Sequence, residues 1–119
     1  MARRRDKVAL ARLAEQAGDL ANAERLYREA IYEGDSHGYN NLAQLVVENG
    51  RLAEGEELFR QGVAAGDSLA AKNLALFLLE QGQESHAKMA IAAARRMGRP
   101  PTPDEISRAR AYRARANKA

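Results

Sequence analysis

Six glycines divide this chain at intervals of sixteen residues, and this spacing is the feature that most restricts its fold. One set, Gly18, Gly50 and Gly82, has a period of 32 residues, and a second set lies halfway between, at Gly34, Gly66 and Gly98. Glycine ends helices because it adopts the left-handed conformation at a helix C-terminus without steric cost. The spacing therefore predicts a series of short helices, each filling one interval.

Between the glycines, apolar residues recur with the period of a helix. The stretch "GDSHGYNNLA" at 34–43 returns as "GDSLAAKNLA" at 66–75, and the i, i+3, i+4, i+7 pattern returns with it. Two helices per period form a hairpin that cannot bury its apolar faces alone, whereas stacked hairpins can. We therefore expect three helix-turn-helix repeats, at residues 4–35, 36–67 and 68–99.

The segment after Gly98, "RPPTPDEISRARAYRARANKA", predicts a linker at 98–102 and one more helix at 103–117. Thr102 and Glu105 have the spacing of a capping box, and Pro103 suits the first helical position. The helix has one apolar stripe and an otherwise Arg-rich surface, as a helix covering the open end of a repeat stack requires. The expected fold is all-α: a right-handed α-solenoid of three repeats plus a C-terminal capping helix, with seven helices in a single domain over residues 1–119.

Composition narrows the functional classes. The chain has no Cys, which excludes disulfides, thiol catalysis and thiolate metal sites. It has no run of about 18 apolar residues, so we expect a cytoplasmic protein without a membrane partner. The net charge of +3 is unevenly distributed: residues 1–12 carry +4, residues 13–94 carry −7, and residues 95–119 carry +6.

These patterns resemble tetratricopeptide repeats over residues 4–99. The first helix of each repeat has a bulky and a small residue together, at Leu10-Ala11, Leu42-Ala43 and Leu74-Ala75. The second helix has a small, a bulky and a small residue, at Ala23/Tyr27/Ala30, Gly55/Phe59/Gly62 and Ala87/Ile91/Ala94. The period of 32 is two short of the family's usual 34, and the "GD" junctions are similar to those of Sel-one-like repeats.

The resemblance implies that the first-helix faces line a concave groove that binds a peptide or helix of a partner protein. The residues expected there are Arg12, His37, Asn40, Asn41, Gln44, Lys72, Asn73 and Leu76. Asn41 and Asn73 match the family's ligand-binding asparagines, and an amide can both donate to and accept from a peptide backbone. Hydrogen bonds to neighbouring helices or to water are the alternative for these two side chains.

The family's carboxylate clamp is incomplete, since Val8, Leu69 and Asn73 stand where basic residues are expected. Leu69, with Leu76 and Leu79, predicts an apolar floor in the third repeat. Contact with the C-terminal helix or with another subunit is the alternative.

No catalytic motif is present, so we expect a non-enzymatic interaction module without metal or cofactor. His37 and His86 lack ligand-like spacing, and the acids at 54, 56 and 57 are expected on a solvated helix face. Two alternatives remain: a nucleic-acid-associated protein acting through its basic ends, and a structural or self-associating component of a larger assembly.

One helix of the second repeat, "LAEGEELFRQGVAA", contains two glycines. Against alanine they cost on the order of 2 kcal/mol together. The sequence predicts that Ala43 faces Gly55, and that Gly55→Ala combined with Gly62→Ala raises the melting temperature.

Overall fold

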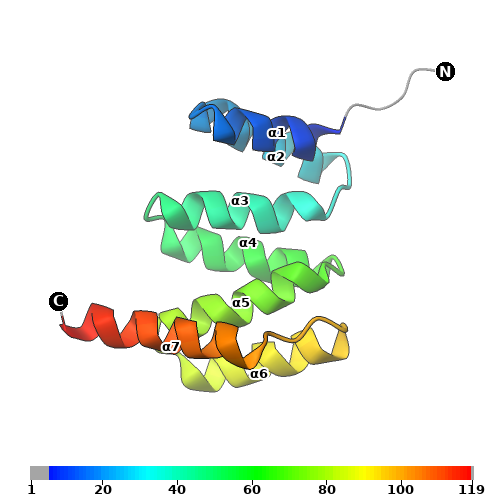
Figure 1. Cartoon of the computed structure of the whole chain (residues 1–119). Helices are drawn as coiled ribbons and strands as arrows, with labels where there is room; N and C mark the ends of the chain where they lie inside the picture. The colour runs from blue at the N-terminus through cyan, green and yellow to red at the C-terminus, as the bar shows by residue number, and fades with distance from the viewer. Residues whose placement is uncertain (1–5, 119) are drawn as a thin grey trace. The chain divides into compact units, whose positions relative to one another are not determined.

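A computed structural model describes residues 6–118, and within that range it contains seven α-helices and no strand (Figure 1). The helices are α1 (Lys7–Gln16), α2 (Leu20–Tyr32), α3 (His37–Glu48), α4 (Leu52–Ala64), α5 (Ser68–Glu80), α6 (Glu84–Arg96) and α7 (Pro103–Lys118). Adjacent helices pack in a repeat-like pattern, with α2 against both α1 and α3, and α6 against α5. The expected all-α helical repeat is confirmed.

The chain divides into two compact units, and the boundary falls inside α4. The first unit ends at Gly62 and the second begins at Val63. The first therefore contains α1 to α3 and most of α4, and the second contains the end of α4 with α5, α6 and α7. The right-handed course of a solenoid and the single-domain organisation stay predictions.

The six periodic glycines end helices as expected. Their φ angles lie between +75° and +92°, the left-handed region that a side chain disfavours. The helix starts also follow the sequence: the carboxylate of Asp67 accepts hydrogen bonds from the first turn of α5. At the start of α7 the capping box is complete, because the Thr102 N–H donates to Glu105 and the Glu105 N–H donates to the Thr102 hydroxyl, at 2.8 and 3.1 Å.

Two glycines inside helices let neighbouring helices of the first unit approach closely. A Cβ on Gly38 would lie 2.9 Å from Ile31 Cγ1, so α3 rests directly on α2 there. A Cβ on Gly55 would lie 3.3 Å from the Ala43 carbonyl oxygen and would overlap the Cγ2 methyl of Val47. The prediction that Ala43 faces Gly55 is confirmed. Because α3 already occupies the space that a methyl group at Gly55 needs, the packing argues against a stabilising effect of alanine there, and the double substitution with Gly62→Ala stays a prediction.

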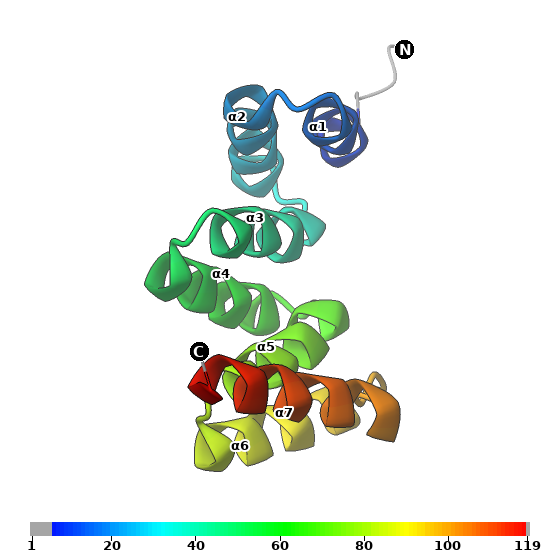
Figure 2. The ribbon, with the colours of Figure 1, turned by 60° about the vertical axis from the view of Figure 1, so that its left-hand side comes forward.

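In the second unit, α5 is buried on most of its circumference. Seven of its residues are buried, among them Leu74, Phe77, Leu78 and Leu79. Helix α6 packs on α5, and α7 also packs along α5 and reaches α6 through an ion pair between Arg110 and Glu84. Figures 1 and 2 both show α7 alongside α5 and α6. The capping helix thus covers a first-helix face of the third hairpin.

Candidate partner-binding face

Helices α1 and α3 contact each other in the first unit and present the first-helix faces of two repeats. The buried Tyr27 of α2 donates a hydrogen bond of 2.7 Å from its hydroxyl to Glu15 of α1. Burial raises the pKa of Tyr27, and the bond to Glu15 raises it further; the charges of Arg12 on α1 and Glu48 on α3 also act on it.

The predicted residues of this face divide by burial. Arg12, His37 and Gln44 are exposed, and Asn41 is half-buried. Asn40 is 2% exposed, so its side chain belongs to the core and presents no surface to a partner. The difference between Asn40 and Asn41 follows from helix geometry, because adjacent residues point about 100° apart around the axis.

Arg12 stands out among the cations of the first unit. Residues 6–62 contain six Lys and Arg side chains, and five of them form ion pairs with glutamates. The paired side chains are those of Lys7, Arg25, Arg28, Arg51 and Arg60. Arg12 makes no hydrogen bond or ion pair with another described residue, and within residues 6–118 the same holds for the amides of Asn41 and Gln44.

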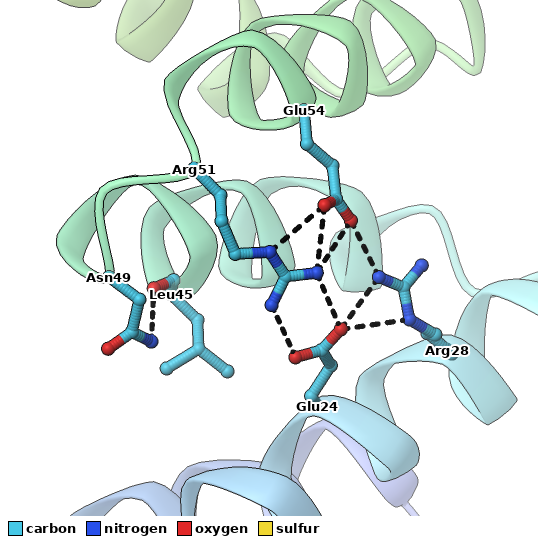
Figure 3. A network of polar contacts seen from close by, with 6 residues as sticks. All are labelled: Glu24, Arg28, Leu45, Asn49, Arg51 and Glu54. Atoms are coloured by element: carbon cyan, nitrogen blue, oxygen red, sulfur yellow. Dashed lines mark hydrogen bonds and ion pairs between the residues drawn. The ribbon is translucent and has the colours of Figure 1, made fainter.

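An ionic network holds α2 to the start of α4, and Figure 3 shows its four members. Arg51 donates to Glu24 at 2.8 Å and to Glu54 at 2.8 Å, and Arg28 donates to the same two carboxylates at 2.7 Å each. The hydrogen bonds from Arg51, and then those from Arg28, lower the pKa of Glu24 to about 2. Glu54, expected on a solvated face, is therefore a structural ion-pair partner. The close pairs at i, i+3 and i, i+4 are readable from sequence, whereas the Arg51–Glu24 contact spans 27 positions.

A shallow groove of about 760 Å³ runs along the outer face of α2. It is lined by Lys7, Ala21, Glu24, Arg25, Arg28, Glu29, Tyr32 and Glu33. The cations and the carboxylates of this groove are paired with each other, and the lysine, for example, lies 3.1 Å from Glu29 and 2.5 Å from Glu33. The groove therefore has little unsatisfied charge with which to recognise a partner.

The predicted residues of the second unit lie on a face that α7 partly covers. The Lys72 ammonium lies 3.0 Å from the carboxylate of Glu105 on α7. Leu76, four residues further along α5, lies on the same stripe as Lys72 and is half-buried. Asn73 is also half-buried. Of these predicted groove residues, Lys72 contacts a helix of the same chain.

The described part of the chain contains no group of three or more His, Asp or Glu side chains arranged to hold a metal ion. Among residues 6–118, no helix combines the length and the apolar character that crossing a bilayer requires. Comparisons with family models, with curated proteins and with solved structures find no match to this chain.

Proposed function

We propose that this protein is a non-enzymatic interaction module that binds an extended segment or helix of a partner protein on the α1/α3 face. The supporting observation is that Arg12 makes no ion pair with another described residue, in a unit whose five other described Lys and Arg side chains are ion-paired. A guanidinium left free on an exposed helix face offers a bidentate site for a carboxylate.

Two amides of α3 add to the recognition chemistry that we propose for Arg12. Gln44 stands 32 residues after Arg12, at the corresponding position of the next repeat, on a helix that contacts α1, and Asn41 precedes Gln44 by three residues on the same stripe. An amide offers donors and an acceptor, so it can pair with a peptide backbone whatever the side chains are. The partner segment should therefore carry an acidic residue to meet Arg12, with its backbone along Asn41 and Gln44.

Selection from a random twelve-residue peptide display library on the immobilised full chain tests this proposal. We expect the selected peptides to be enriched in Asp and Glu, and their affinity to fall about tenfold or more for Arg12→Gln, the effect of losing a charged hydrogen bond. Arg95→Gln is the matched control, because Arg95 is an exposed arginine of α6. Peptides that bind Arg12→Gln as tightly as the unchanged chain would refute the proposal.

A second candidate function is binding of nucleic acid through α7. Arg108 and Arg115 lie seven residues apart on that helix, with the half-exposed Tyr112 between them, and both arginines are exposed. Two cations flanking an aromatic ring suit a phosphate backbone with a base stacked on the ring. The basic N-terminal residues 3–5 lie outside the described range. A mobility-shift assay at low and high salt decides this case, and the absence of a shift at low salt eliminates it.

A further inference from the structure

Helix α7 packs along α5 but has few buried side chains of its own, and Ile106 is half-buried. Of its sixteen residues one is buried, Ala109, which is 5% exposed. Two ion pairs add to this contact: Glu105 with Lys72, at 3.0 Å, and Arg110 with Glu84, at 3.0 Å. The Arg110–Glu84 pair is exposed and adds little stability, whereas the Lys72–Glu105 pair is part-buried. With one buried residue in sixteen, α7 buries few of its own side chains for a helix of this length.

The same helix has the properties of one that keeps its shape when it is detached. Its sequence, PDEISRARAYRARANK, is rich in alanine and arginine, which have high helix propensity. Its capping box is made within the helix itself, between Thr102 and Glu105. One oxygen of Glu105 accepts from the Thr102 N–H while the other accepts from Lys72, so a single carboxylate both caps the helix and docks it.

The surface under α7 presents a defined set of contacts. At one end of this surface, Lys72 pairs with Glu105 of α7. At the other end, Arg113 of α7 lies against the turn at Gly82, so closely that a Cβ added to Gly82 would lie 2.8 Å from Arg113 Nε. Leu76 and Leu79 lie between these points on the same stripe of α5. An occupant thus needs an acidic residue for Lys72, a small residue over the stripe, and an arginine about eight positions after the acid. In α7 these are Glu105, Ala109 and Arg113.

We infer that this face of α5 is a helix-docking site, and that α7 is its resident, exchangeable occupant. The partner that it fits is an amphipathic helix with the pattern Glu-x-x-x-Ala-Arg-x-x-Arg, the pattern of α7 itself. A partner helix of this kind displaces α7 and meets Lys72, Glu84 and the Gly82 turn in its place. This site lies in the second unit and is independent of the Arg12 face.

The test uses the full chain and a fluorescent synthetic peptide with the sequence of residues 101–118. In the chain variant Ala109→Asp, a carboxylate at the buried position weakens the docking of α7. We expect the peptide to bind this variant about tenfold more tightly than the unchanged chain, whose own α7 competes at an effective concentration in the millimolar range. Fluorescence anisotropy gives both affinities.

Charge exchange locates the bound peptide. A Glu105→Lys peptide should lose binding to the Ala109→Asp chain and regain it when the chain also carries Lys72→Glu. The Arg108→Gln peptide is the matched control and should bind like the unchanged peptide, because Arg108 is exposed. Should Ala109→Asp lose its helical circular dichroism, a chain carrying Glu105→Lys takes its place, with the unchanged peptide as ligand.

Equal affinity of the peptide for the unchanged chain and for the weakened variants would overturn the inference, and so would a charge exchange without rescue. Light scattering on the unchanged chain gives a third outcome. The unchanged chain could have twice the mass of one chain, while the Ala109→Asp chain has the mass of one. That result would mean that the α7 of a second copy binds this face, and it would overturn the assignment to a partner helix.

Discussion

Replacing Gly55 by alanine tests how closely α3 and α4 approach each other in the first unit. Alanine should gain about 1 kcal/mol of helix propensity over glycine. Against this gain, the new methyl group meets the Ala43 carbonyl oxygen at 3.3 Å and overlaps Val47 Cγ2, which belongs to a β-branched side chain with little rotamer freedom. Overpacking of this kind costs about 1–3 kcal/mol. The expected net loss is about 0–2 kcal/mol.

Thermal unfolding followed by circular dichroism measures this loss, which corresponds to a fall in melting temperature of up to about 8 °C. The double variant with Val47→Ala isolates the cause. In that background the overlapping methyl is absent, and Gly55→Ala should become neutral or stabilising by up to about 1 kcal/mol. Comparing Glu57→Gly with Glu57→Ala on the exposed face of the same helix gives the propensity difference alone. If Gly55→Ala raises the melting temperature of the otherwise unchanged chain, the packing argument is wrong.

Two further predictions concern the ionic network around Glu24 and the neighbouring residues Asn40 and Asn41. The folded-state pKa of Glu24 is lowered to about 2 from a usual value near 4.5, so its network stabilises the fold above pH 4.5 and loses this contribution as the pH falls toward 2. At this partly exposed site the effect is about 1 kcal/mol. Arg51→Gln should make the free energy of unfolding in urea depend less on pH across that window, and an unchanged pH dependence would contradict the linkage. Asn40→Ala should destabilise the fold by about 2 kcal/mol because the Asn40 side chain is buried. Asn41→Ala should change the free energy of unfolding by less than about 0.5 kcal/mol. Equal effects of the two substitutions in urea titrations would count against the placement of Asn40 alone in the core.

The regular part of the fold could be predicted because it depends on local chemistry. A left-handed glycine, a capping carboxylate and an apolar period each act within one or two helical turns, and each is visible in the sequence. The capping box at Thr102 and the turn at Gly82 are examples. These signals fix where helices begin and end, and they predict the pairing of neighbours.

What could not be predicted depends on distances between helices. From the sequence, Gly55 only lowers the helix propensity of its segment. The position of Val47 in the structure shows that there is no room for a side chain at Gly55. Asn40 and Asn41 are adjacent in sequence and chemically identical, yet a rotation of about 100° places one in the core. The packing of α7 on α5 could not be predicted from the sequence either, because the Lys72–Glu105 ion pair joins residues 33 positions apart.

The partner-binding face of the first unit stays a prediction. Arg12 and Gln44 are exposed and Asn41 is half-buried, whereas Asn40 belongs to the core and Lys72 pairs with α7. The sequence could suggest these residue types at these positions. The sequence could not show that the other described Lys and Arg side chains of the unit form ion pairs. That pairing is the reason why we propose Arg12 as the residue that binds a partner's carboxylate.

The central claim is that a partner segment binds on the α1/α3 face through Arg12 and the neighbouring amides. A nitrogen-15 NMR titration of the full chain with a selected acidic peptide tests it most directly. The Arg12 Nε–H signal and the side-chain amide signals of Asn41 and Gln44 should move together, with one dissociation constant, while the amide signals of Arg108 and Arg115 stay in place. Shifts confined to α7, with Arg12 unchanged at saturation, would contradict the claim.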